Sequence, residues 1–204
     1  MADDRISVTP MAATLLGIAC LLCDSALLCA LLLCAAVHEG GHLLTIRLMG
    51  RHVDSVEVEF LGVSMHCETA SYTQELIAAS AGPAASFVLA AGLALLGKAP
   101  QDEFCVMTCG MSAVLGAFNL LPIMPLDGGR ILRAWAMMAT DIDAAERIVG
   151  VTGIISCLGL VGLGVWNTFA SGNWTALAAA IVLTVKNILP SGRRRAIANK
   201  GEII

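Results

Sequence analysis

The residues best suited to chemistry form the segment HEGGH, residues 38–42, inside an otherwise apolar stretch. Positions four apart share one face of an α-helix, so His38 and His42 can direct two imidazoles at one metal ion, with Glu39 beside them. Zn²⁺ takes imidazole nitrogen readily, and a catalytic zinc site uses three protein ligands plus a water. Glu39 would be the general base that takes the proton of the metal-bound water as it attacks a carbonyl. The pattern therefore indicates a zinc hydrolase that needs a third ligand.

The candidate third ligand is Asp127, in the segment NLLPIMPLDGGR at residues 119–130. At 1.5 Å per residue, His38 lies about 20 Å along one predicted membrane helix and Asn119 lies about 22 Å along another, so the two reach similar depth. The two prolines of the segment interrupt a helix, and irregular backbone at membrane depth is tolerated where it is buried in protein or lines a watery cavity. We expect this turn to bring Asp127 to the metal. The alternative is a solvated loop that only ends a helix.

The composition indicates an integral membrane protein. The 204 residues are 57% hydrophobic and 14% charged, and the mean hydropathy is +0.81, whereas soluble proteins are about a quarter charged. A net charge of -4 and 4% aromatic residues give no nucleic-acid footprint. Ionisable groups in an apolar helix mark a functional site by default. Hydrogen bonding between helices would account for one histidine but not for the triplet.

We predict an all-α polytopic membrane protein with about six transmembrane helices. No small-x-small cleavage site follows the first apolar run, so we count it as a span rather than a signal peptide. A segment of about 20 apolar residues crosses a bilayer, and the predicted spans are residues 7–23, 26–49, 75–97, 104–124, 148–170 and 174–190. A small β-hairpin at the membrane surface is expected between the second and third spans, over residues 53–66. We expect a single membrane-embedded domain, residues 1–204.

The distribution of basic residues predicts the orientation. If both termini are cytoplasmic, eleven of the twelve Lys and Arg residues lie on or near the cytoplasmic side, and only Lys98 faces out. Water would then reach the site from the cytoplasm. An extended substrate segment could add to an exposed strand edge. The segment 53–66 and the turn at 122–125 are candidate platforms, and an ordinary surface hairpin is the alternative for 53–66.

The remaining metal-binding residue types carry weaker signals. Cys20 and Cys23 have a CxxC spacing without a second pair, and most of the eight cysteines fall in apolar runs. We interpret them as small buried hydrophobic residues. His52 and His66 lack a partner at helical spacing and are expected to be surface or interfacial residues.

The two motifs together resemble the site-2 protease family of intramembrane zinc metalloproteases. HEGGH lies in an early span and NLLPIMPLDGG follows about eighty residues later. The compact chain is similar to the branch that contains the stage IV sporulation protein FB. The resemblance covers, and so implies, a three-helix core at about 26–140. This resemblance implies one Zn²⁺ per chain and a membrane-bound protein substrate in a lipid bilayer. A bacterial cell membrane is the expected location. No PDZ or CBS domain fits this chain, so substrate choice would rest on the membrane domain or on separate regulatory membrane proteins.

The resemblance also implies roles for individual residues. It makes His38, His42 and Asp127 the zinc ligands and Glu39 the base that activates water. It places Asn119 and the turn from Pro122 to Pro125 against the substrate backbone. In a third family element, AGPAAS, it implies that Gly82 and Pro83 kink a helix. Many relatives have Asn where this chain has Ser86, so we expect Ser86 to be a packing position without a side-chain role.

Two further functions use the same residues. A membrane zinc transporter or zinc sensor would bind the metal without proteolysis, but a carrier should hold polar ligands on several helices, and this chain shows one compact set. An inactive scaffold for a transmembrane partner is hard to reconcile with a base and three ligands. The favoured hypothesis is an intramembrane metalloendopeptidase.

Overall fold

The computed structural model describes residues 5–10, 13, 14, 17, 20, 21, 24–51, 53–59, 62–67, 71–96, 102–172 and 174–188. The chain divides into two compact units, residues 1–119 and residues 120–204, which are described in turn. Eight of the seventeen residues of the predicted first span, 7–23, lie outside the described residues. The expectation of one domain over the whole chain stays a prediction.

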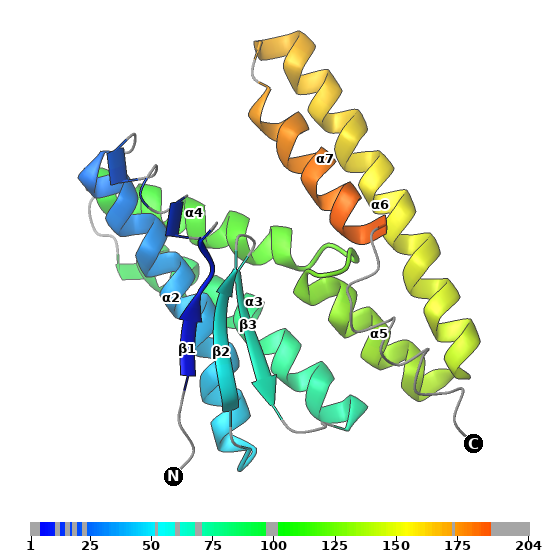
Figure 1. The fold of residues 1–204 in the computed structure, drawn as a ribbon. Helices are drawn as coiled ribbons and strands as arrows, with labels where there is room; N and C mark the ends of the chain where they lie inside the picture. The colour runs from blue at the N-terminus through cyan, green and yellow to red at the C-terminus, as the bar shows by residue number, and fades with distance from the viewer. Residues whose placement is uncertain are drawn as a thin grey trace. The chain divides into compact units, whose positions relative to one another are not determined.

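The first unit is built on three helices that pack on one another, α2 (Ser25–Leu48), α3 (Tyr72–Leu96) and α4 (Glu103–Asn119) (Figure 1). Asp24 begins α2, where its carboxylate accepts the Ala26 N–H at 3.2 Å, the usual role of an acidic N-cap. Every fourth residue of α2 is buried: Ala30, Cys34, His38, His42 and Ile46. The two histidines therefore lie on the face of α2 that packs against the neighbouring helices.

A three-stranded sheet belongs to the same unit. Its order is β1 (Arg5–Val8), β2 (Val53–Glu59) and β3 (Gly62–Cys67), with β1 parallel and β3 antiparallel to β2. β2 and β3 occupy the segment predicted as a hairpin, and their place at a membrane surface stays a prediction. β1 was not predicted. The predicted first span began at residue 7, which was wrong for residues 7 and 8, because their backbone pairs with β2.

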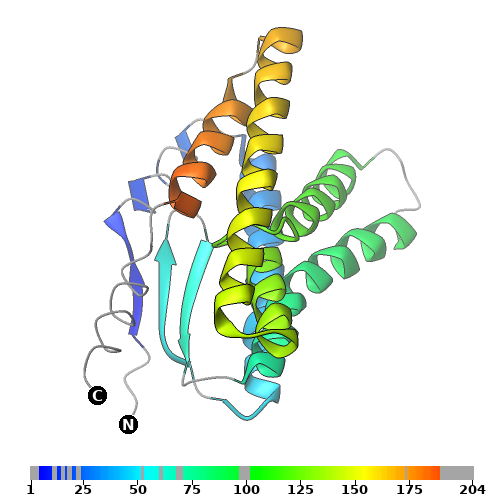
Figure 2. The same cartoon turned by 90° about the vertical axis from the view of Figure 1, so that its right-hand side faces the viewer.

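The second unit contains α5 (Asp127–Ala139), α6 (Ile142–Ser171) and α7 (Thr175–Ile188). α6 packs with both α5 and α7, and the yellow and orange helices α6 and α7 run side by side in both views (Figures 1 and 2). Gly172 ends α6 with a φ of 69°, a left-handed conformation that glycine adopts without strain. The chain then reverses into α7.

Three described helices are long and apolar enough to cross a membrane: Ser25–Leu48, Tyr72–Leu95 and Ile142–Ser171. They match the predicted spans 26–49, 75–97 and 148–170. Glu103–Asn119 and Thr175–Val185 are apolar but shorter. The predicted fourth span, 104–124, ran five residues too far, because α4 ends at Asn119. Pro122 lacks the N–H that a continuing helix would need.

Candidate metal centre

The two histidines lie together on the buried face of α2. Their exposed fractions are 4% for His38 and 6% for His42. The ring centroids are 5.1 Å apart and the ring planes meet at 80°. The common face expected from the spacing is therefore present, and it is turned into the protein. Glu39, the predicted base, is half-buried beside His38 on the same helix.

A backbone carbonyl of α3 fixes the protonation of His42. The Nδ1 atom of His42 lies 2.7 Å from the carbonyl oxygen of Ala78. A carbonyl oxygen only accepts, so Nδ1 must carry the proton and donate it. The lone pair is then on Nε2, the nitrogen left for a metal. Such an outer partner is typical of metal-binding histidines, because it fixes both the tautomer and the ring orientation.

The hydroxyl of Ser86 lies against the ring of His38. Its Oγ lies 2.9 Å from His38 Nδ1, and Ser86 has no exposed surface. The interpretation of Ser86 as a packing position did not include this hydrogen bond. Buried polar atoms are paired because an unpaired one loses its hydration without compensation, and a hydroxyl can accept the proton of a neighbouring imidazole.

Gly82 leaves room for the ring of His42. A Cβ atom at this position would overlap the imidazole, so only glycine lets α3 come this close to His42. Pro83 follows inside α3, which continues to Leu96. Ala78, Gly82 and Ser86 are spaced four apart and share one face of α3. This spacing of small residues indicates a face of α3 that another helix can approach closely, but it does not identify the outer partners of the histidines.

In the second unit, Asp127 is the first residue of α5 and is 7% exposed. A carboxylate is favoured at a helix N-terminus, where the unpaired N–H groups carry partial positive charge. Arg130, one turn later, places Nη1 3.7 Å from Asp127 Oδ1. Arg130 was not predicted as a neighbour of this carboxylate.

The turn before Asp127 is tightly folded, as the prolines predicted. The Ile123 N–H donates to the Leu121 carbonyl at 2.7 Å, and the Leu126 N–H donates to the Ile123 carbonyl at 2.8 Å. A Cβ atom at Gly129 would lie 2.7 Å from the Ile123 carbonyl, so glycine allows α5 to begin against the turn. Ile123 is fully buried. This turn is therefore a packed structure rather than a solvated loop.

The predicted substrate-binding residues flank and form this turn. Asn119 ends α4, and its Nδ2 donates to the Leu115 carbonyl at 3.0 Å. Pro122 and Pro125 lie between α4 and α5. Their contacts with a substrate stay predictions.

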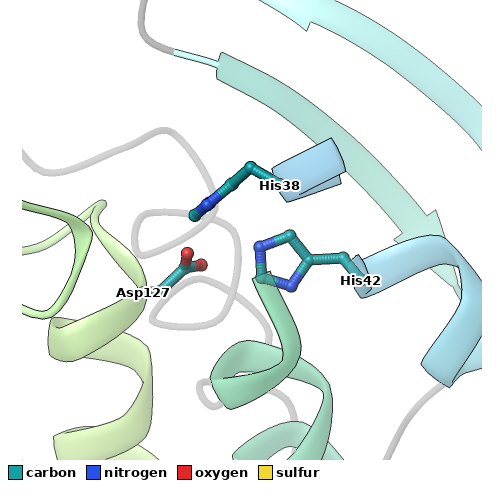
Figure 3. Close-up of side chains that lie close together, drawn as sticks. All are labelled: His38, His42 and Asp127. Carbon is teal, nitrogen blue, oxygen red and sulfur yellow. The ribbon is translucent and has the colours of Figure 1, made fainter. Parts of the chain in front are cut away.

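Among the described residues, His38, His42 and Asp127 form a group that could hold a metal ion. Each offers one ligand atom, and these atoms all lie within 4.8 Å of one another (Figure 3). All three residues are buried. Two imidazoles and one carboxylate are a donor set that zinc takes in catalytic sites. The residues present therefore fit zinc.

Comparisons with known proteins agree with this chemistry. Residues 11–124 match the family Peptidase M50B-like, and residues 99–161 match Peptidase family M50. A Synechocystis protein named as a zinc metalloprotease is 32% identical over 172 residues, which is 77% of this chain and 45% of that protein. A Mycobacterium tuberculosis protein named as zinc metalloprotease Rip3 is 33% identical over 70% of this chain and 42% of that protein. The chain thus spans less than half the length of these curated relatives.

The fold is similar to that of a solved structure, the site-2 protease from Methanocaldococcus jannaschii. The TM-score is 0.67 with 18% identity, and the match covers 94% of each chain. The apolar helices and the relatives together make this chain a multi-pass integral membrane protein. The family and the donor set imply zinc. Because the family match covers more than half of the sequence, this chain belongs to the M50 peptidases, the site-2 protease family.

Proposed function

We propose that this protein is an intramembrane zinc metalloprotease. It hydrolyses a peptide bond in or near a transmembrane segment of a membrane-bound protein. His38, His42 and Asp127 hold one Zn²⁺, and Glu39 is the catalytic base. The observation that carries the proposal is the buried group of two imidazoles and a carboxylate, with ligand atoms within 4.8 Å of one another.

The residues of the chain have separate tasks in this reaction. When bound, zinc supplies a Lewis acid that polarises the scissile carbonyl and makes water more acidic. The Glu39 carboxylate accepts the proton of the attacking water and then gives a proton to the departing amine. The Ala78 carbonyl holds the imidazole of His42 with Nε2 available. Burial of the ligands keeps competing water from the histidines.

The substrate backbone must be extended when it reaches Glu39. Within the described residues β3 is an edge strand, since it pairs with β2 on one side only, and an extended peptide can add to such an edge. Asn119, Pro122 and Pro125 are proposed to contact the same peptide near the metal. An ordinary surface hairpin remains the alternative for the sheet.

The proposed orientation places both termini and the water entrance in the cytoplasm of a bacterial cell. It is supported by the eleven of twelve basic residues that this topology puts on or near that side. Regulation by separate membrane proteins and membership of the sporulation branch both stay proposals. A zinc transporter is less favoured, because one group of potential ligands is found in the described residues and a carrier should place ligands at several depths.

The substitution Glu39→Gln tests the proposed function. A glutamine keeps the size of the side chain but cannot accept the proton, so cleavage of a co-expressed membrane substrate should fall by about 10²- to 10⁴-fold. The zinc content should stay near that of the wild type. Glu103→Gln is the control, since Glu103 is an exposed residue in the first turn of α4. Normal cleavage by Glu39→Gln would remove Glu39 as the base.

A further inference from the structure

We infer that Ser86 is a positioning residue that holds the imidazole of His38 ready for the metal. The inference rests on the proposed function, because it assigns Ser86 a task toward a proposed zinc ligand. The observation is the 2.9 Å contact between Ser86 Oγ and His38 Nδ1. It connects α2 and α3 at residues 48 positions apart in the sequence.

The two histidines depend on α3 in different ways. His42 donates to the carbonyl of Ala78, a backbone atom that side-chain substitution does not remove. His38 contacts a side chain, and that side chain has no exposed surface. Water cannot readily replace a hydroxyl in a site without solvent, and a buried hydrogen bond counts for more in a low dielectric. His38 is therefore the ligand whose hydrogen bond to α3 can be removed by a side-chain substitution.

The neighbouring helix α4 holds Ser86 in place. The hydroxyl of Ser112, also fully buried, donates to the Ser86 carbonyl at 2.8 Å. Gly116, one turn later, leaves room for Ser86, since a Cβ atom there would lie 3.1 Å from Ser86 Cβ. Ser86 is thus packed on both sides, and its hydroxyl lies at a fixed distance from the ring of His38.

The consequence concerns the tautomer of His38. When Ser86 Oγ accepts the proton of Nδ1, the lone pair is on Nε2, as it is in His42. Without that acceptor, either nitrogen can carry the proton, and the ring loses the contact that fixes its rotation. Loss of an outer partner of a metal-binding histidine typically weakens metal affinity by about 10- to 100-fold.

The test measures the zinc affinity of the full chain in detergent by competition with a chromogenic chelator. Ser86→Ala is expected to weaken zinc binding by about 10- to 100-fold. Thr108→Val is the matched control, because it removes the hydroxyl of a buried α4 residue that donates within its own helix, to the Phe104 carbonyl. It should change zinc affinity much less. The absorption spectrum of the Co²⁺-loaded protein provides a second readout, and it should change in Ser86→Ala because the imidazole is no longer oriented.

The outcomes separate the inference from the proposed function. If His38→Ala abolishes zinc binding while Ser86→Ala matches Thr108→Val in affinity and in spectrum, the inference is wrong and the zinc site stands. If zinc binding survives His38→Ala, the site and the inference both fail. Should Ser86→Ala not yield folded protein, Ser86→Cys keeps a similar volume with a much weaker acceptor, and the same comparison applies. Zinc affinity and Co²⁺ spectrum equal to wild type in Ser86→Cys would contradict the inference.

Discussion

The long apolar helices α2 and α6 bury their side chains in the same pattern but differ in chemistry. Both are long and apolar enough to span a membrane, and both bury residues mainly four positions apart. On α2 these residues are Ala30, Cys34, His38, His42 and Ile46. On α6 they are Ala145, Val149, Gly153, Cys157 and Gly164. A row of buried residues along one face of a helix therefore serves packing by itself. On α2, two of these residues are histidines, and they make this face part of a candidate metal centre.

The neighbouring helices explain why α2 rather than α6 carries these histidines. α3 offers a backbone carbonyl, a hydroxyl and a glycine to the two imidazoles. α7 offers α6 the amide of Asn187, whose Nδ2 lies 3.7 Å from Cys157 Sγ, and a close backbone approach at Gly164. Buried polar groups need partners, so the histidines of α2 require the matching face of α3.

The largest effect is expected from His42→Ala, compared with Cys157→Ala at a buried position of α6. Removing His42 takes away a proposed ligand, so zinc should be lost and cleavage should fall to background. Cys157→Ala leaves the donor set intact and should keep zinc and cleavage. Metal analysis of both purified proteins checks this. A zinc-loaded His42→Ala protein would contradict the assignment of metal binding to the buried face of α2.

Gly82→Ala should have the next largest effect, with Gly92→Ala as its control on the same helix. A methyl group at Gly82 meets the ring of His42, whereas one at Gly92 meets nothing within 4 Å. The ring must move away from the Ala78 carbonyl, so zinc affinity should fall by about tenfold or more. Gly92→Ala should leave zinc affinity unchanged and stabilise α3 by up to about 1 kcal/mol. Equal zinc affinities in the two variants would show that the position of the His42 ring does not depend on the absence of a side chain at Gly82.

A smaller effect, confined to stability, is expected from Gly164→Ala on α6. Its Cβ atom would lie 2.8 Å from Leu177 Cα, and backbone cannot move aside easily. Overpacking of this kind costs about 1–3 kcal/mol. Gly162→Ala is the control, since nothing lies within 4 Å of its Cβ position. Thermal unfolding should separate the two variants while zinc content stays equal. A change of zinc content in Gly164→Ala would weaken the contrast between α2 and α6.

The smallest effect is expected from the ion pair that joins α5 and α6. Arg133 Nε donates to Glu146 Oε1 at 3.0 Å, and about a third of each side chain is exposed. Solvent screening limits such pairs, so Arg133→Met should cost at most about 1 kcal/mol of unfolding free energy and leave cleavage unchanged. A double-mutant cycle with Glu146→Gln measures the coupling. A coupling of several kcal/mol would show that this pair is shielded from solvent.

The sequence predicted those parts of the protein that are marked by a regular spacing of residues or by a long apolar run. The spacing of His38 and His42 predicted their common face, and the prolines predicted the packed turn before Asp127. The three long spans followed from the length of their apolar runs. The strand β1 escaped prediction because four residues are too few to show an alternating pattern. The sporulation branch and the cytoplasmic orientation stay predictions.

The outer partners of the histidines could not be predicted in the same way. Ala78 acts through its backbone carbonyl, and Gly82 acts by having no side chain. Ser86 differs from the Asn of many relatives, so the resemblance indicated a packing position. These roles depend on how closely α3 approaches α2, which the separate apolar patterns of the two helices do not specify.

The most direct test of the proposed metal centre is X-ray absorption spectroscopy of the zinc-loaded protein, compared with Asp127→Ala. The proposed site predicts one zinc per chain with nitrogen and oxygen ligands at about 2.0–2.2 Å and no sulfur shell, since sulfur would appear at about 2.3 Å. Asp127→Ala should lose an oxygen ligand and bind zinc more weakly. A sulfur shell from any of the eight cysteines, or an unchanged spectrum in Asp127→Ala, would contradict a zinc held by His38, His42 and Asp127.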